Sequence, residues 1–330
     1  MPITTGSRNS FVAWHLALIT LLTATGAAQG QSYPQKPIRV IVGSAPGGAP
    51  DILARAIGQK MTDALGQQVV IDNRAGASGA IGAEMTAKAV ADGYTLFLST
   101  TMGFAILPHV KKKLSYDAIK DFSSITQLAS ASNVLVINPS VPAKSVAELL
   151  QLAKTRPGGL NYGSAGSGSP AHLAGEMLNM MAGVSMTHVP YKGAAPALLD
   201  TIAGHVQFII TSPISAAPHI NSGKLRALAT TGSKRNVTFP DLPTVADTLP
   251  GFEITQWWGL SAPSRTPKAV IDRLHAEAAK AITMPDVRDR IARDGAAAVG
   301  GTPGEFDALI VAESRRFSEL IRKAGIKVED

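Results

Sequence analysis

The chain has 330 residues, with 31 Lys and Arg against 24 Asp and Glu, so its formal net charge is 31 − 24 = +7. Hydrophobic residues make up 45% and charged residues 17%, which supplies enough apolar material for a buried core and excludes a disordered chain. The absence of cysteine excludes disulfides, thiolate metal sites and cysteine nucleophiles, and aromatics at only 5% disfavour base stacking, so no nucleic-acid partner is expected.

The first thirty residues predict a secretory signal peptide. Arg8 precedes an apolar stretch from Phe11 to Leu22, and small residues follow it. This stretch is shorter than the roughly 20 apolar residues that a transmembrane helix needs. We therefore expect cleavage after Ala28 or Gly30 and a mature protein in the periplasm. Removal of residues 1–30 takes away one arginine and no acid, which leaves a charge of 30 − 24 = +6.

Strands and helices alternate along the next part of the chain. Short apolar runs that end in small residues indicate buried strands, and apolar residues at helical spacing indicate the helices between them. The predicted strands are 38–42, 69–71, 94–98, 134–137, 161–164, 186–189, 206–210 and 225–229. The predicted helices are 52–65, 81–91, 146–155, 171–181 and 196–202. This alternation predicts an α/β fold with largely parallel sheets.

Two regions depart from this alternation. Residues 111–132 have weaker periodicity and begin with three lysines, which indicates a solvated face. Residues 252–263 read as extended, and helices are predicted at 267–282, 285–293 and 303–324. Thr302 is the expected N-cap of the last helix, and Gly325 is its expected C′ glycine.

Glycine-rich corners stand between strands and helices at 45–51, 73–80, 163–170 and 191–196. Each corner places small residues just before a helix, where free backbone N–H groups and the helix dipole attract anions. A single corner of this kind is explained by a tight turn. Several of them in one chain favour a binding cleft at the carboxyl ends of the strands.

Several residues belong to types that catalyse reactions or bind ligands in other proteins, and each can be interpreted in two ways here. His172 and Glu176 lie four apart and either ligate a metal or play a structural part; Asp51 is either an acid catalyst or an acceptor of N–H bonds in the first helical turn. Arg74 either clamps a carboxylate or pairs with Asp72 or Asp51. Trp257 and Trp258 are either core aromatics or a lid over the ligand. No hydrolase, metallopeptidase or nucleotide-binding motif occurs, so we expect no enzyme activity, no cofactor and no metal.

A set of short motifs, in order along nearly all of the mature chain, resembles the Bug-type extracytoplasmic receptors of tripartite tricarboxylate transporters. The motifs are Tyr33-Pro34-Gln35-Lys36-Pro37, Pro46-Gly47-Gly48 with Asp51, Asn73-Arg74 with Gly76-Ala77, Asp92-Gly93-Tyr94, Asn161-Tyr162-Gly163-Ser164-Ala165-Gly166, His188-Val189-Pro190-Tyr191-Lys192-Gly193, Gly223-Lys224-Leu225-Arg226, Pro243-Thr244-Val245 and Trp258-Gly259. Each motif is weak alone, and the ordered set is specific.

The resemblance implies a two-lobed periplasmic-binding-protein fold of type II, with a ligand cleft between the lobes. Lobe 1 would comprise residues 31–131 and 255–330, and lobe 2 residues 132–254. The protein would be a monomer that captures a small carboxylate and delivers it to the permease subunits of a tripartite transporter. A carboxylate sensor that serves no transporter, or a secreted enzyme on the same scaffold, is the alternative.

The resemblance also implies the binding residues. Backbone groups of the first corner and of the lobe 2 corner would hold the ligand's proximal carboxylate, partly through water. Matched to this sequence, the expected contacts are Gly47, Gly48 and Ala49 in lobe 1, Ser164, Ala165 and Gly166 in lobe 2, and the side chains of Ser99, Thr100 and Ser212. Ser44-Ala45 stands where the family often has an aromatic residue or proline, which implies a smaller wall there.

Overall fold

The computed structural model describes residues 1–2, 33–236, 239–293 and 295–323. Nearly all of the predicted signal peptide and the predicted C′ glycine Gly325 lie outside these residues. The chain divides into two units, residues 1–35 and 36–330, and every element below belongs to the second. Among the described residues, no helix has the length and apolar character of a membrane span.

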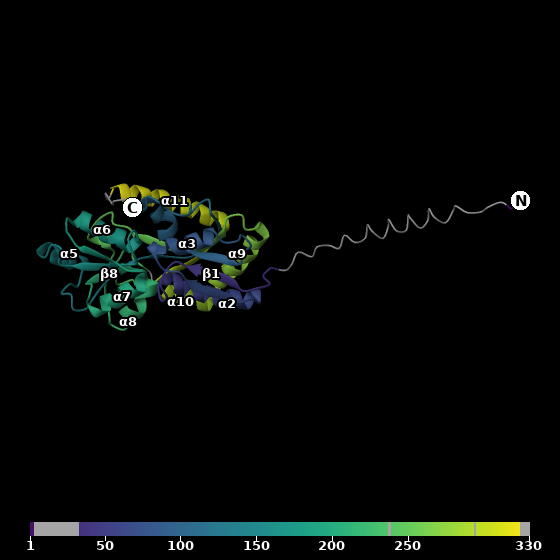
Figure 1. The fold of residues 1–330 in the computed structure, drawn as a ribbon. Coiled ribbons are helices and arrows are strands. Elements are labelled where there is room, and N and C mark those ends of the chain that lie inside the picture. Colours follow the sequence, from purple (N-terminus) through teal and green to yellow (C-terminus); the bar gives the residue numbers. More distant parts are fainter. Residues whose placement is uncertain (3–32, 237–238, 294, 324–330) are drawn as a thin grey trace. The chain divides into compact units, whose positions relative to one another are not determined.

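One sheet of the second unit has six strands in the order β11-β4-β10-β3-β1-β2. We call the part of the chain built on it lobe 1 (Figure 1). Its strands are β1 (Ile38–Val42), β2 (Val69–Asn73), β3 (Thr95–Thr100), β4 (Phe122–Ser132), β10 (Thr255–Pro263) and β11 (Ala297–Gly300). Its helical segments are α2 (Ala49–Leu65), η1 (Ala77–Gly79), α3 (Ala80–Ala87), η2 (Met102–Ile106), α4 (Leu107–Val110), α9 (Lys268–Thr283), α10 (Pro285–Arg293) and α11 (Pro303–Lys323).

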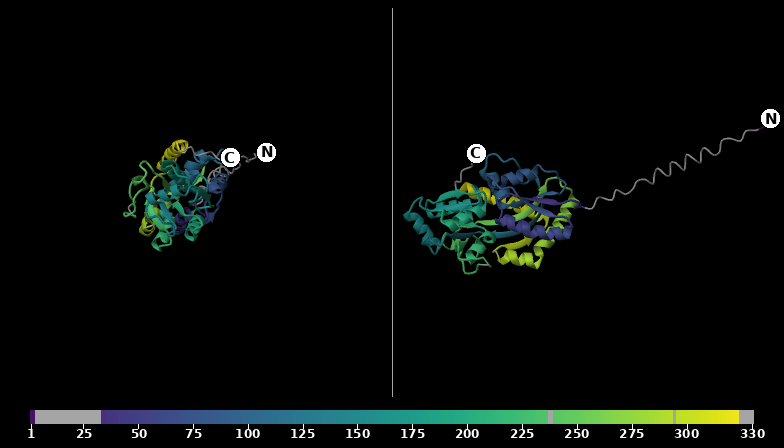
Figure 2. Two further views of the ribbon diagram at one scale, coloured as in Figure 1. Left: turned by 90° about the vertical axis from the view of Figure 1, so that its left-hand side faces the viewer. Right: turned by 60° about the horizontal axis from the view of Figure 1, so that its bottom comes forward.

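The other sheet has five strands in the order β7-β6-β8-β5-β9, and we call the part built on it lobe 2. Its strands are β5 (Val134–Ile137), β6 (Asn161–Ser164), β7 (Thr187–Pro190), β8 (Phe208–Thr211) and β9 (Arg226–Thr230). Its helical segments are α5 (Val146–Thr155), α6 (Pro170–Ala182), α7 (Ala194–Ala203), α8 (Pro213–Asn221) and η3 (Val245–Asp247). The second view of Figure 2 shows these helices gathered on the teal and green strands.

The expectation of largely parallel sheets is wrong. Within the described ranges, four strand pairs are parallel, β1 with β2 and β3, and β6 with β7 and β8. Five pairs are antiparallel, including the long pair β4 and β10 at the centre of the lobe 1 sheet. For β4 and β10 the cause is the path of the chain, because β4 leads towards lobe 2 and β10 leads back, so these two strands run in opposite directions.

The two crossings between the lobes lie side by side. Asn133 follows β4 directly and receives a hydrogen bond of 2.8 Å on its carbonyl oxygen from the N–H of Thr231. The Thr231 carbonyl accepts in turn from the N–H of Ile254 at 2.9 Å. The predicted lobe boundaries at residues 131/132 and 254/255 stay a prediction, and these hydrogen-bonded crossings lie beside them.

Local sequence explains why the helices begin and end at these residues. In α2, Leu53, Ile57, Met61 and Leu65 recur on one face and are buried, and Gly66 ends the helix in the left-handed conformation at φ 65°. At the start of α11, Thr302 and Glu305 form the reciprocal hydrogen bonds of a capping box, which confirms the predicted N-cap.

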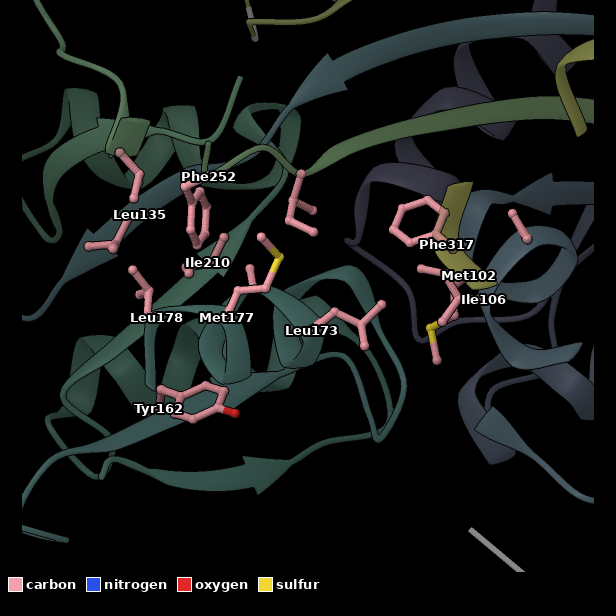
Figure 3. Close-up of a cluster of buried hydrophobic side chains, with 14 of the residues drawn as sticks. Met102, Ile106, Leu135, Tyr162, Leu173, Met177, Leu178, Ile210, Phe252 and Phe317 are labelled. Atoms are coloured by element: carbon pink, nitrogen blue, oxygen red, sulfur yellow. The ribbon is translucent and has the colours of Figure 1, made fainter. Parts of the chain in front are cut away.

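Buried side chains of both lobes form one continuous cluster. Figure 3 shows Leu135, Ile210 and Phe252 on one side of it and Met102 and Phe317 on the other. Leu173 of α6 lies between these two groups in the same view. Apolar contact therefore continues from one lobe into the other.

Candidate functional site

A cavity of about 370 Å³ lies between the lobes. Its walls come from the carboxyl ends of β1, β3, β6 and β8 and from the helices that follow, which is where open α/β sheets place their ligands. The lining residues are Gly43, Ser44, Gly48, Ala49, Pro50, Gly76, Ala77, Ser78, Gly79, Phe97, Leu98, Thr100, Met102, Gly103, Lys111, Ala165, Gly166, Ser167, Ser169, Pro170, Ala171, Pro190, Tyr191, Lys192, Gly193, Ala194, Ile210, Thr211, Ser212, Ser215, Gln256 and Trp258.

Helix N-termini from both lobes line this cavity. They belong to α2 and α3 in lobe 1 and to α6, α7 and α8 in lobe 2, and these helices have 17, 8, 13, 10 and 9 residues. Each helix N-terminus carries a partial positive charge of roughly half an elementary charge. Several of them around one cavity make its electrostatic potential favourable for an anion.

The lobe 1 corner leaves two N–H groups without an acceptor in the described part of the chain, those of Gly48 and Ala49. Gly48 is the N-cap of α2 and has extended backbone angles, φ −79° and ψ 164°, with no side-chain cap. Both residues line the cavity. They can therefore donate to a ligand.

Gly47 is placed differently from the expectation. Its N–H donates to the carboxylate Oδ2 of Asp51 at 2.9 Å, and Gly47 is not among the residues that line the cavity. Burial raises the pKa of the Asp51 carboxyl, but the Arg55 guanidinium and the Gly47 N–H outweigh it and hold that pKa below its usual value. Asp51 thus accepts an N–H bond in the first helical turn, as one of the two predicted readings has it, and fixes the corner.

The lobe 2 corner is held in part by its own side chains. The N–H of Gly166 donates to the Ser164 hydroxyl at 3.1 Å, and Ser164 is fully buried and does not line the cavity. The N–H of Ala165 has no acceptor among the described residues, and both Ala165 and Gly166 line the cavity. Ala165 is thus the predicted lobe 2 residue whose N–H is best placed to donate to a ligand.

Of the three side chains that are predicted to contact the ligand, two line the cavity and one does not. Thr100 and Ser212 line the cavity; the Thr100 hydroxyl accepts from the N–H of Gly103, and the Ser212 hydroxyl caps α8. Ser99 is fully buried, and its hydroxyl pairs with that of Ser261 at 2.7 Å inside the lobe 1 sheet. Ser99 therefore contributes to the sheet rather than to the cavity wall.

The facing corners touch one another. The hydroxyl of Ser78 in η1 donates to the carbonyl oxygen of Ser167 at 2.7 Å. A Cβ atom added to Gly193 would lie 3.2 Å from the backbone nitrogen of Ala45. Backbone of lobe 2 thus packs directly on backbone of lobe 1, and the small residues of the corners permit this approach.

The charge around the cavity is positive. Lys111 and Lys192 are among the lining residues, and no acidic side chain is among them within the described ranges. The predicted solvated lysine run therefore contributes its first member to the cavity wall. A ligand with a carboxylate meets complementary charge here, whereas an ammonium group would meet none.

The structure shows the surroundings of three residues for which the sequence left two interpretations open, Arg74, Trp257 and Trp258. Arg74 pairs with Asp72 at 3.0 Å and is absent from the cavity wall. Trp258 is 2% exposed and lines the cavity, so it is both a core aromatic and part of the wall. Trp257 is buried against the ring of Phe306, with centroids 5.3 Å apart.

His172, Glu176 and Asp51, on which an enzyme hypothesis depends, do not converge in the cavity. The Glu176 carboxylate accepts the Tyr162 hydroxyl at 2.7 Å, and Nδ1 of His172 accepts the N–H of Gly168 at 2.9 Å. Within the described residues, no group of three or more His, Cys, Asp or Glu is arranged to hold a metal ion.

Several lining residues are not among the predicted ligand contacts. Ser44 and Ser215 line the cavity, and their hydroxyls are buried without a hydrogen-bond partner among the described residues. Phe97, Met102 and Ile210 supply apolar wall. Only the departure at Ser44 gave a signal in the sequence, since the other residues read as ordinary core or helix-cap positions.

This arrangement defines a two-lobed binding protein with an anion-ready cleft, and comparison with known proteins agrees. The family model described as "Tripartite tricarboxylate transporter family receptor" (TctC) matches residues 53–326. The chain is 35% identical to the protein BugT of Bordetella pertussis (strain Tohama I), over 95% of this chain and 98% of that one.

Two solved structures from Rhodopseudomonas palustris carry small acids. Rpa4515, solved with adipate, has 35% identity and a TM-score of 0.87, covering 89% of this chain and 99% of that one. MatC, solved with bound malate, has 31% identity and a TM-score of 0.84, covering 88% of this chain and all of that one. The chain belongs to the family of tripartite tricarboxylate transporter receptors, which are solute-binding proteins.

Proposed function

We propose that this protein is a periplasmic receptor that captures a small carboxylate between its lobes and delivers it to the permease subunits of a tripartite transporter. The observation that carries the proposal is that Gly48, Ala49 and Ala165 line one cavity and that their N–H groups have no acceptor among the described residues. Adipate and malate in two relatives support a carboxylate ligand. The signal peptide, the monomeric state and the permease partner are parts of the same proposal.

A thermal-shift screen of the mature protein tests the ligand class. The panel pairs each acid with its uncharged amide, for example adipate with adipamide and benzoate with benzamide, since each pair shares size and apolar surface. At a hundred times its Kd a ligand stabilises the folded state by about 2.7 kcal/mol. We expect at least one acid to raise the melting temperature and its amide to leave it unchanged.

Stabilisation by the amides alone, or by no compound in the panel, would refute the ligand class. Delivery needs a separate measurement, the uptake of the stabilising acid by cells that lack the receptor and by the same cells complemented with it. Uptake that is equal in both would leave binding intact and refute delivery.

A further inference from the structure

Two histidine rings stack behind the lobe 2 corner, outside the cavity wall. His172 comes from the first turn of α6 and His188 from β7. Their ring centroids lie 4.0 Å apart, and the ring planes differ by 15°. The corner in front of them supplies Ala165, Gly166 and Ser167 to the cavity.

His172 holds this corner through an unprotonated nitrogen. Its Nδ1 accepts the backbone N–H of Gly168 at 2.9 Å. Gly168 has φ 76° and stands between Ser167 and Ser169, both of which line the cavity. If Nδ1 carried a proton, it would be a donor facing the Gly168 N–H, which is also a donor, and the hydrogen bond would be lost. The observed corner therefore requires neutral His172.

His188 does not have the same constraint. Its Nε2 lies 2.6 Å from the Ser164 hydroxyl, which also accepts the N–H of Gly166 and lies 3.1 Å from the Gly166 carbonyl. The hydroxyl can donate to neutral His188, or accept from protonated His188 while it donates to the carbonyl. Ser164 is therefore satisfied in either state of His188.

The groups around the pair favour a single charge on it. The Glu176 carboxylate lies 4.0 Å from Nε2 of His172, on the same face of α6, and it accepts the Tyr162 hydroxyl. Burial and the neighbouring carboxylate raise the pKa of the Tyr162 phenol, which keeps this hydroxyl a donor. Protonation of His172 thus finds a counter-charge, whereas protonation of both stacked rings would place two cations 4.0 Å apart.

We propose that His172 is a positioning residue that makes ligand affinity depend on pH, with the neutral ring holding the lobe 2 corner and its protonation at Nδ1 releasing Gly168 and weakening binding. This inference rests on the proposed function. A protonated ring also adds positive charge near the anion, which acts in the opposite direction. The loss of the corner dominates, because the proton enters at the atom that holds Gly168.

The test is isothermal titration with adipate and malate at pH values from 8.0 to 5.5. We expect the wild-type Kd to rise about three- to tenfold between pH 7.5 and 5.5, because histidine is the side-chain type that changes charge in this range. In His172→Asn an amide oxygen replaces Nδ1 and does not titrate, so affinity at pH 7.5 stays within about threefold and the pH dependence flattens. His172→Phe removes the acceptor and should weaken binding at every pH.

His205→Gln is the matched control, because His205 is exposed and pairs with Asp200 away from the cavity. The wild-type slope retained in His172→Asn, or affinity that is constant or rises on acidification, would overturn the inference. If neither acid binds at pH 7.5, the proposed function fails for these ligands. The Gly168 amide resonance still reports on the coupling in the ligand-free protein, and should shift with pH in the wild type and not in His172→Asn.

Discussion

The hydroxyl of Ser78 in lobe 1 donates a hydrogen bond of 2.7 Å to the carbonyl oxygen of Ser167 in lobe 2. Ser78 adopts φ 58°, and Ala77 before it adopts φ 45°. Residues other than glycine rarely adopt positive φ angles, and strained backbone of this kind occurs at ligand clamps. The bond joins two residues of the cavity wall that come from different lobes, so we expect it to stabilise the arrangement in which both lobes face the ligand.

Replacement of this hydroxyl should weaken ligand binding. A neutral hydrogen bond contributes about 0.5–1.5 kcal/mol, so Ser78→Ala should raise the Kd by roughly two- to tenfold. Unfolding of the ligand-free protein should change little, because each lobe keeps its core. Isothermal titration and thermal melting measure the two effects. Ser185→Ala, at an exposed position of lobe 2, is the control, and an equal change there would contradict the role of Ser78.

Gly48→Val should reduce binding far more than stability. A Cβ atom at Gly48 would lie 3.6 Å or more from its neighbours, and the extended backbone suits valine. The added side chain would shield the N–H groups at the start of α2 from a ligand. Titration should show a loss of at least tenfold in affinity with little change in melting temperature.

Gly66→Val is the reciprocal control for that substitution. Gly66 has φ 65° with no atom within 4 Å of an added Cβ, so valine there meets backbone strain and no clash. The cost should be about 1–2 kcal/mol of stability with affinity unchanged. Comparable losses of affinity in both variants would refute the assignment of Gly48 to the site.

Asp51→Asn should lower stability in a pH-dependent manner. The pKa of the Asp51 carboxyl is lowered in the folded protein, so its contribution is present above the unfolded pKa of about 3.9 and is lost as pH falls through the folded value. The difference in melting temperature between wild type and variant should be largest near pH 7 and shrink at pH 3.5. A constant difference would show that the carboxylate charge is not involved.

Gly259→Ala should destabilise lobe 1. A Cβ atom at Gly259 of β10 would lie 2.1 Å from the ring of Phe306, which is 1% exposed in α11. Such overpacking costs about 1–3 kcal/mol. Gly304→Ala, in the first turn of the same helix with no atom within 4 Å, should be neutral or stabilise by up to about 1 kcal/mol. Chemical denaturation distinguishes the two.

The elements that were predicted correctly depend on local signals. Strand β1 is a short apolar run, α2 ends at a glycine, and α11 begins with a capping box, and all three follow from neighbours in the sequence. Strands β4 and β11 were missed, because their pairing with each other is set by residues far apart in the chain. Helix α8 was missed for a different, local reason, because it contains Pro218 in its interior and proline there normally breaks a helix.

The sequence predicts which glycine-rich corners form the site, but not which of their N–H groups are available to a ligand. Composition predicts the corners at 45–51 and 163–170, and the family resemblance implies Gly48, Ala49 and Ala165 within them, which line the cavity. Composition could not show that the Gly47 and Gly166 N–H groups already have acceptors. The bond between Ser78 and Ser167 and the stack of His172 on His188 join residues from different elements, so neither had a local signal.

In the proposed function, backbone N–H groups of two facing corners bind a carboxylate. A crystal structure of the mature protein with the most stabilising acid of the panel tests it most directly. We predict a carboxylate oxygen within about 3.2 Å of the N–H of Gly48 or Ala49, and a bond to Ala165, directly or through one water. An acid held at the mouth by Lys111 or Lys192 alone, with these N–H groups unoccupied, would contradict the account.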